Sequence, residues 1–312
     1  MSDAIEIKNL VKRYKEVLAL DHFNLQVKEG EIFGLLGPNG SGKTTAINCI
    51  LALLQYDKGE IKVFGKEMLP DSYESKRNIG VVMQNVAVFE ELSVYENVDY
   101  FCGLYIKDKK IRKQYVEEAI SFVGLEEYVK FLPKKLSGGL LRRLNIACGI
   151  AHKPRLIFFD EPTVAVDPQS RNKILEGILR LNKEGATIVY TSHYMEEVET
   201  LCDRIIILDK GNILARGTSD ELKELAEIEE KITVEVNDLE DKYINKILEL
   251  KNVDVVTYSG NTLLITYKKG KNNISDMVEF LKNNKINYNK IFSERPTLND
   301  VFLELTGKEL RD

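Results

Sequence analysis

The stretch "GPNGSGKTT" at residues 37–45 constrains the fold of this chain more than any other feature. It fits the pattern G-x-x-x-x-G-K-[ST], with Gly37, Gly42, Lys43 and Thr44 at the defining positions. The apolar run "EIFGLLG" before it is typical of a buried strand, and "TTAINCILALL" after it has helical spacing. In this strand, loop, helix order, backbone N–H groups and a helix N-terminus converge on phosphate groups. We therefore predict a nucleotide site, with Lys43 reaching the outer phosphates and Thr44 ligating Mg²⁺.

A second signal is the acidic pair at the end of "RLIFFDEPT". Four apolar residues precede Asp160, so a buried strand would deliver Asp160 and Glu161 at its carboxyl end, where open α/β sheets bind ligands. We predict that Asp160 holds Mg²⁺ and that Glu161 polarises the attacking water. A phosphate-binding loop alone does not distinguish a kinase from a GTPase or a motor protein. The acidic pair is the signal that separates these classes.

A third signal is "LSGG" at residues 136–139, followed by the helical pattern "LLRRLNIACGIA". Ser137, Gly138 and Gly139 at a helix start form a second cluster of backbone donors for an anion. One nucleotide does not need two such sites within the same chain.

Composition argues against several classes of protein. A length of 312 residues and 44% hydrophobic content suffice for two packed domains. The net charge of −5 gives no basic field for a nucleic acid. The start "MSDAIEIKNL" lacks a signal-peptide pattern, and no run approaches the roughly 18 apolar residues that span a bilayer. Four cysteines without C-x-x-C spacing suit a reducing compartment, so we expect a cytoplasmic protein with no nucleic-acid partner.

The pattern along the chain predicts two domains. Strand patterns before residue 65 and in "RLIFFDEP", "ATIVYTSH" and "RIIILDKG" indicate an α/β core. Residues 71–151 have a helical character, with an inserted helical subdomain at about 85–151. After residue 223, six segments follow the order strand, helix, strand, strand, helix, strand of a ferredoxin-like unit. We predict a P-loop NTPase domain over 1–222 and an α+β accessory domain over 223–312, outside the chemical site.

Together the motifs resemble those of the ATP-binding cassette (ABC) transporter ATPases. In that family two subunits dimerise head to tail, and each nucleotide lies between the phosphate loop of one subunit and the LSGG signature of the other. The resemblance covers the chain to about residue 220 and accounts for the second anion site. It implies ATP and Mg²⁺ as ligands, a second ATPase subunit, a homodimer being expected, and a separate membrane permease that holds the protein at the inner face of the cell membrane.

The resemblance also assigns roles to single residues. Tyr14 is placed to stack on adenine, Gln84 in "VVMQN" to lie at the Mg²⁺, Asp167 to occupy the D-loop, and His193 in "TSHYMEE" to be the switch histidine. The catalytic set is Glu161, His193, Lys43 and Asp167, and the metal set is Thr44, Gln84 and Asp160. The nucleotide contacts are Tyr14, Asn39, Gly40, Ser41, Gly42, Lys43, Thr44, Thr45, Gln84, Ser137, Gly138 and Gly139.

The sequence departs from the family pattern after the signature. Leu140 stands where Gln is frequent, and a leucine side chain cannot hydrogen-bond a ribose. The D-loop "TVAVD" is also unusual, although it keeps Asp167. We expect these changes to affect affinity more than chemistry.

Two apolar segments outside the site carry further expectations. The family docks its membrane subunit near the segment after Gln84, which makes Phe89, Leu92, Val94 and Tyr95 candidate exposed contacts. In "SERPTLNDVFLELTG", which resembles the ending of exporter ATPases of the daunorubicin-resistance type, an apolar stripe at helical spacing is predicted to be packed. The residues of this stripe are Leu298, Val301, Phe302 and Leu305.

The function that these observations predict is the ATP-hydrolysing subunit of an ABC exporter. The alternative is a soluble ABC-type ATPase acting on ribosomes or DNA. Such proteins usually carry two fused cassettes or a long coiled coil between the motifs, and neither is present here.

Overall fold

The computed structural model describes residues 2–226, 228–237, 239–268 and 273–307. The chain divides into two compact units, one up to Ser219 and one from Asp220 onward. The predicted domain boundary at residues 222 and 223 stays a prediction, and residues 308–312 of the predicted accessory domain lie outside the described residues.

A six-stranded sheet forms the centre of the first unit, in the order β10-β9-β3-β8-β7-β6. All strand pairs in it are parallel except β10 with β9. The bounds are β3 (Ile32–Leu36), β6 (Ile79–Val82), β7 (Leu156–Asp160), β8 (Thr187–Ser192), β9 (Arg204–Asp209) and β10 (Asn212–Gly217). Every residue of β3, β7 and β8 is buried, as expected of central strands covered on both faces.

Two of these strands differ from the sequence predictions. Strand β6 lies within the region predicted to be helical, because its four residues are too few to show a strand period beside the helical patterns around them. Strand β10 was not predicted at all. It is an edge strand with mostly exposed or half-buried side chains, so it lacks the apolar run of its neighbours.

A four-stranded antiparallel sheet, in the order β2-β1-β4-β5, completes the α/β core. Its bounds are β1 (Asp3–Tyr14), β2 (Val17–Lys28), β4 (Lys58–Val63) and β5 (Lys66–Glu67). Its buried side chains share one core cluster with α1 (Lys43–Ile50) and with residues of β3, β7, β8 and β9. The strands predicted before residue 65 are thereby confirmed.

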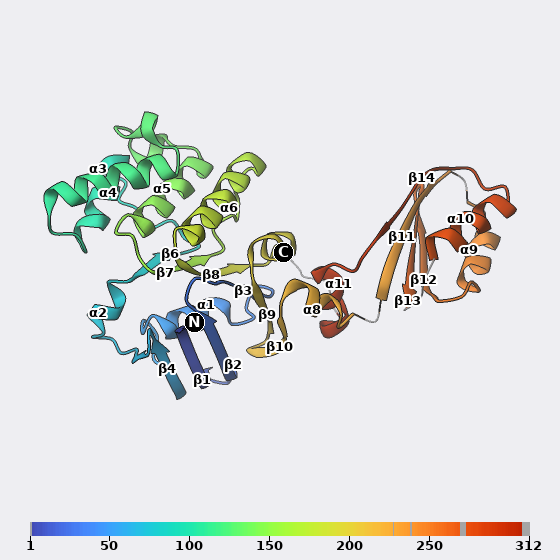
Figure 1. The fold of residues 1–312 in the computed structure, drawn as a ribbon, viewed down its shortest axis with the longest axis horizontal. Helices are drawn as coiled ribbons and strands as arrows, with labels where there is room; N and C mark the ends of the chain where they lie inside the picture. Colours follow the sequence, from blue (N-terminus) through green and yellow to red (C-terminus); the bar gives the residue numbers. More distant parts are fainter. Residues whose placement is uncertain (1, 227, 238, 269–272, 308–312) are drawn as a thin grey trace. The chain divides into compact units, whose positions relative to one another are not determined.

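Helices α3 (Val94–Gly103), α4 (Lys109–Phe122) and α5 (Gly138–Ile150) form a lobe beside β6 and β7 (Figure 1). The other helices of the first unit are α2 (Tyr73–Lys76), α6 (Pro168–Lys183) and α7 (Met195–Leu201), with two short 3₁₀ turns at Glu126–Tyr128 and Pro133–Lys135. Helix α8 (Ser219–Lys223) lies at the division between the units. No helix in the described ranges is long and apolar enough to cross a membrane.

The second unit has the predicted order of elements: β11 (Ile228–Val236), α9 (Asp241–Leu248), β12 (Val253–Ser259), β13 (Thr262–Lys268), α10 (Asn273–Asn283), β14 (Tyr288–Glu294) and α11 (Leu298–Thr306). Its sheet is antiparallel with the order β12-β13-β11-β14, the arrangement of a split βαβ unit. The fold class, a P-loop α/β core with an α+β unit after it, is therefore confirmed.

The apolar stripe on α11 is packed as predicted at three positions and exposed at the fourth. Leu298, Val301 and Phe302 are buried, whereas Leu305 is 40% exposed. The prediction for Leu305 is therefore wrong. It stands two residues before Gly307, whose left-handed backbone ends the helix, so the helix stops directly after this position.

Phe302→Ala tests the energetics of this stripe, with Leu305→Ala as its matched control on the same helix. Phe302 is 2% exposed, so its truncation is expected to lower the free energy of unfolding by about 3 to 5 kcal/mol. Leu305→Ala is expected to change it by less than about 1 kcal/mol, because its side chain is largely solvated. Denaturant unfolding of the two variants measures the difference, and equal losses would contradict the assigned burial.

A buried histidine links the helical lobe to the sheet. His152 follows α5, its Nε2 lies 3.0 Å from the carbonyl oxygen of Ile79 on β6, and its ring stacks on Tyr105 with centroids 3.9 Å apart. Because a carbonyl only accepts, the neutral ring donates from Nε2. Burial lowers the pKa of His152 from 6.5 to about 4.

This lowered pKa makes stability depend on pH with a defined sign. Between pH 6.5 and about 4 the unfolded chain binds the proton that folded His152 excludes, so the free energy of unfolding falls as the pH falls. We expect His152 to contribute a loss on the order of 2 kcal/mol between pH 7 and pH 5. Denaturant unfolding at both pH values should show a shallower dependence in His152→Gln. Identical slopes in wild type and His152→Gln would refute the assignment.

Candidate nucleotide site

The phosphate loop connects the end of β3 to the start of α1, as predicted. Two of its glycines cannot be replaced without strain. A Cβ on Gly37 would lie 2.2 Å from the carbonyl oxygen of Leu208 on β9, and Gly42 has a φ of 113° with the carbonyl oxygen of Ala19 2.7 Å from its Cβ position. The loop is therefore held closely against β2 and β9, which fixes the direction of its N–H groups.

A pocket of 340 Å³ lies over this loop. Most of the predicted nucleotide contacts line it, namely Asn39, Gly40, Ser41, Gly42, Lys43, Thr44, Thr45 and Gln84, together with Glu161. Residues that the sequence analysis grouped as nucleotide contacts therefore lie together around one pocket. Ser41 differs from its neighbours, because its hydroxyl is buried without a hydrogen-bond partner and lies against Gly37.

Lys43 is buried at the base of this pocket. Its Nζ donates to the carbonyl oxygens of Gly37 and Pro38, at 2.6 and 3.1 Å, and lies 3.2 Å from Oε1 of Glu161. All three partners are oxygen atoms, so a phosphate oxygen can replace any of them without changing the chemistry of the ammonium group.

Three predicted site residues from distant parts of the chain contact the carboxylate of Glu161. Besides Lys43, Gln84 donates from Nε2 to Oε2 at 3.3 Å, and Nδ1 of His193 lies 3.2 Å from the same oxygen. The backbone of Glu161 has a φ of 49°, a strained conformation for a residue with a Cβ, and its N–H donates to the hydroxyl of Thr191 at 3.0 Å. This strain turns the carboxylate out of the line of β7 toward the pocket.

Two oxygen ligands suitable for a divalent cation lie side by side: the Thr44 hydroxyl, whose residue lines the pocket, and the carboxylate of Asp160, which is buried and does not line it. The Thr44 hydroxyl donates to Oδ2 of Asp160 at 3.0 Å, and the Thr191 hydroxyl holds Oδ1 at 2.6 Å. A hydroxyl beside a fixed carboxylate is a donor set that fits Mg²⁺. Gln84, the third predicted ligand, contacts Glu161 instead.

The signature residues do not line this pocket. Ser137 is the N-cap of α5 and accepts from the N–H of Leu140, while Gly138 faces open space. Gly139 packs on the start of α6, where an added Cβ would lie 3.0 Å from Oδ2 of Asp167. The signature and the D-loop residue therefore form a second, separate cluster within one chain.

Asp167 caps α6, its Oδ1 accepting from the N–H of Ser170 at 2.9 Å. This backbone hydrogen bond lowers the pKa of Asp167. The carboxylate of Asp167 is therefore held in its ionised form, next to Gly139 of the signature.

Tyr14 also lies outside the pocket. It ends β1 with its side chain 46% exposed, and the ammonium of Lys12 lies 5.2 Å from the centre of its ring. The exposed face of the ring is free to stack on an adenine, so this role stays a prediction.

Four pocket residues were missed by the sequence analysis: Val17, Leu18, Ala19 and Lys210. Lys210 lies in the turn between β9 and β10, which reaches the phosphate loop through a hydrogen bond from the N–H of Gly211 to the carbonyl oxygen of Ser41 at 2.9 Å. No local sequence signal marks this contact, because it depends on a pairing of residues far apart in the chain.

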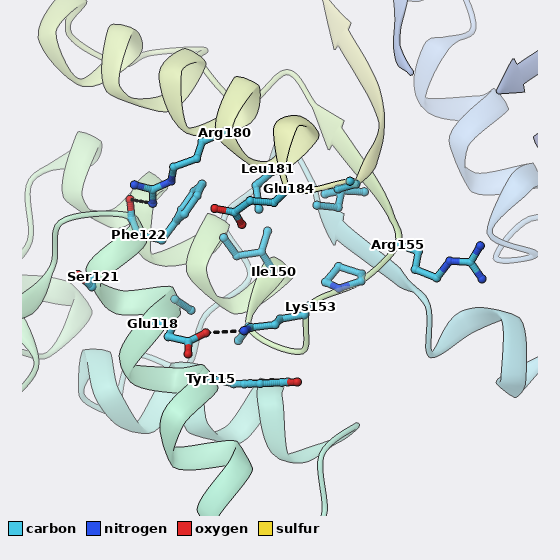
Figure 2. Close-up of a pocket in the computed structure, with 16 residues that line it drawn as sticks. Tyr115, Glu118, Ser121, Phe122, Ile150, Lys153, Arg155, Arg180, Leu181 and Glu184 are labelled. Atoms are coloured by element: carbon cyan, nitrogen blue, oxygen red, sulfur yellow. Dashed lines mark hydrogen bonds and ion pairs between the residues drawn. The ribbon is translucent and has the colours of Figure 1, made fainter. Parts of the chain in front are cut away.

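A larger cavity of 610 Å³ lies elsewhere, between α4, α6 and the segment after α5 (Figure 2). It contains none of the predicted site residues, and the cations around it already have partners. Lys153 pairs with Glu118 at 2.5 Å, Arg180 donates to the carbonyl oxygen of Phe122, and Arg155 pairs with Glu29. The smaller pocket remains the candidate nucleotide site, because the phosphate loop, Lys43 and Glu161 line it.

Comparison with known proteins identifies the class that this site defines. The family described as ABC transporter matches residues 20–164, and the family described as ATP-binding protein DrrA1-3-like, C-terminal domain, matches residues 217–306. The chain belongs to the ATP-binding proteins of ABC transporters. The second match places it with the DrrA type of exporter ATPase, as its terminal segment predicted.

Individual relatives agree with this assignment. The linearmycin resistance ATP-binding protein LnrL of Bacillus subtilis is 37% identical, the alignment covering 99% of this chain and 100% of that protein. The daunorubicin resistance ATP-binding protein DrrA3 of Streptomyces coeruleorubidus is 32% identical over 99% of this chain and 97% of that protein. A solved dimeric ATP-binding cassette, described in a post-hydrolysis state with ADP and phosphate, is 30% identical with a TM-score of 0.64, covering 69% of this chain and 98% of its own.

The chain is thus an ATPase, the ATP-binding subunit that energises an ABC transporter. Subunits of this kind dimerise and work with a separate permease. None of these relatives supports the alternative of an ATPase acting on ribosomes or DNA.

Proposed function

We propose that this protein drives the export of a compound through a separate permease, as two copies that close on two molecules of MgATP. The observation that supports this most is the convergence of Lys43, Gln84 and His193 on the carboxylate of Glu161. A buried carboxylate with a cation, an amide and an imidazole around it is suited to orient a water molecule. When Lys43 binds a phosphate oxygen instead of Glu161, the carboxylate becomes available to that water.

In this proposal each residue has a defined task. The N–H groups of residues 39–45 and the Lys43 ammonium bind the phosphates, and Thr44 and Asp160 hold Mg²⁺ with Gln84 nearby. Bound Mg²⁺ neutralises phosphate charge. Glu161 accepts a proton from the attacking water, His193 holds the carboxylate in place, and Tyr14 stacks on the base.

The second cluster is proposed to serve the other subunit of a homodimer. Ser137, Gly138 and Asp167 are exposed on the chain, away from the pocket over the phosphate loop. The Ser137 hydroxyl and the backbone N–H groups of Ser137 and Gly138 are proposed to donate to a nucleotide held by a second copy, with Asp167 facing the same partner. The second unit of each chain is proposed to act outside the chemical site, in dimer stability or regulation.

The permease is proposed to dock beside Gln84. Phe89 is exposed, and its ring lies 4.8 Å from that of Tyr100, which is also exposed. Val94 is fully buried, so this residue of the predicted contact set is excluded from it. The protein would thereby be held at the cytoplasmic face of the membrane.

The direct test is to identify the membrane protein that co-purifies with the full chain and to reconstitute both in vesicles. We expect MgATP added to the side that carries the ATPase to move a fluorescent hydrophobic drug to the opposite side. Movement in the reverse direction would establish import and overturn the proposal of export.

A further inference from the structure

A buried acid on α7 lies behind the site and was not among the predicted site residues. Glu197 is 4% exposed, and one of its carboxylate oxygens, Oε2, accepts three hydrogen bonds from hydroxyl groups. The donors are Thr163 at 2.9 Å, Tyr190 at 2.7 Å and Ser192 at 3.0 Å. All three are buried, so this oxygen has no access to solvent.

The other carboxylate oxygen of Glu197 faces helix α6. Oε1 lies 3.3 Å from Nε of Arg171, and the guanidinium of Arg171 also lies over the ring of Tyr194, 4.6 Å from its centroid. The N–H of Arg171 donates to the carbonyl oxygen of Asp167 at 2.9 Å, within the first turn of α6. Glu197 is therefore connected to the start of α6, where the proposed partner-facing residue Asp167 is the cap.

Three partners of Glu197 are close in sequence to residues with proposed roles in hydrolysis. Thr163 comes two positions after Glu161, Ser192 directly precedes His193, and Arg171 comes four positions after Asp167. The Ser192 hydroxyl also accepts from the N–H of Tyr194 at 2.9 Å, which closes the turn containing His193. One carboxylate thus contacts all three segments.

We propose that Glu197 is a positioning residue for ATP hydrolysis, holding the segments of Glu161, His193 and Asp167 in one arrangement through its ionised carboxylate. The inference rests on the ATPase activity assigned above. The charge is essential because every group around the carboxylate is a donor or a cation: three hydroxyls donate to Oε2, and the guanidinium of Arg171 lies beside Oε1 as an ion pair in which Nε makes no hydrogen bond. A glutamine of the same shape must turn its NH₂ toward one set of donors.

Glu197→Gln tests this, with Glu31→Gln as its matched control. Glu31 is 8% exposed, and its carboxylate pairs with Arg204 at 2.6 Å and accepts from the N–H of Lys28. It precedes β3, at the end of that strand opposite the phosphate loop. Both variants thus remove the charge of a buried arginine-paired carboxylate, and only one of these lies behind the site.

We expect Glu197→Gln to lower kcat by on the order of tenfold while the Kd for ATP stays within about twofold of wild type. Both variants should lower the melting temperature by a similar amount, but Glu31→Gln should leave kcat unchanged. Steady-state hydrolysis, binding of a fluorescent ATP analogue and thermal unfolding give the three readouts. If Glu197→Gln loses only stability, as the control does, the positioning role is wrong.

Arg171→Gln is a second variant in case Glu197→Gln does not fold. The Arg171 side chain is 32% exposed, so its replacement disturbs the packed interior less. This variant should also lower kcat with little change in Kd. The double variant should be no slower than the slower single one, since both remove the same contact. Multiplicative losses would refute a shared interaction. A wild-type protein that hydrolyses no ATP would overturn the assigned activity, and with it the basis of this inference.

Discussion

Replacing Glu161 with glutamine is expected to lower ATP turnover by on the order of 10² or more while nucleotide affinity stays near wild type. Glutamine keeps the shape of the side chain and its contacts to Gln84 and His193, but an amide cannot accept a proton from water. Glu161 is 4% exposed, and the hydrogen bond from its N–H to the Thr191 hydroxyl fixes its backbone, so the substituted side chain should stay in the same place. Release of phosphate from MgATP, measured with binding of a fluorescent ATP analogue, gives both quantities.

Lys43→Ala provides the contrasting variant at the same site. Lys43 lies 3.2 Å from Glu161, so both residues occupy one small volume, yet the ammonium is proposed to bind phosphate and the carboxylate to act on water. Lys43→Ala should therefore weaken binding itself. Substantial turnover in Glu161→Gln, or a loss of affinity as large as that of Lys43→Ala, would contradict the assigned role of Glu161.

The pocket could be predicted because three motifs follow three fully buried parallel strands. In the sheet, β8 lies between β3 and β7, with Leu36 paired to Ser192 and Asp160 to Thr191. The loop after β3, the acid pair that ends β7 and the histidine after β8 therefore reach the same edge. The motifs do not reveal the order of the strands. In any order, however, the carboxyl ends of neighbouring parallel strands lie at the same edge of the sheet.

The residues that the sequence did not reveal depend on contacts between distant segments. Glu197 stands beside the exposed Glu196 in "MEEVETL", and a run of acids on a short helix is typical of a solvated face. Only the tertiary fold shows that one of these acids is buried among three hydroxyls. Lys210 is similar, because it joins the pocket through the antiparallel pairing of β9 with β10, the edge strand that lacks an apolar pattern.

A mixture of two inactive variants should regain activity if each nucleotide lies between two copies of the chain. Lys43→Ala removes the phosphate contact of one half-site, and Ser137→Arg places a long cation where the second donor cluster faces outward. A mixed dimer contains one site with both defects and one site with none. Each variant alone has a defect in every site, so neither should hydrolyse ATP at an appreciable rate.

Random association of equal amounts makes about half of the dimers mixed, so the mixture should recover at most about a quarter of wild-type turnover per chain. The structure favours this outcome because Gly138 has open space beside it and none of Ser137, Gly138 and Gly139 lines the pocket over the phosphate loop. Mixing Lys43→Ala with Glu161→Gln is the control. Lys43 and Glu161 belong to the same half-site, so every site of that mixed dimer remains defective and no activity should return. Recovery in the control, or none in the first mixture despite dimers seen by size exclusion with MgATP, would show that the two donor clusters do not share a nucleotide.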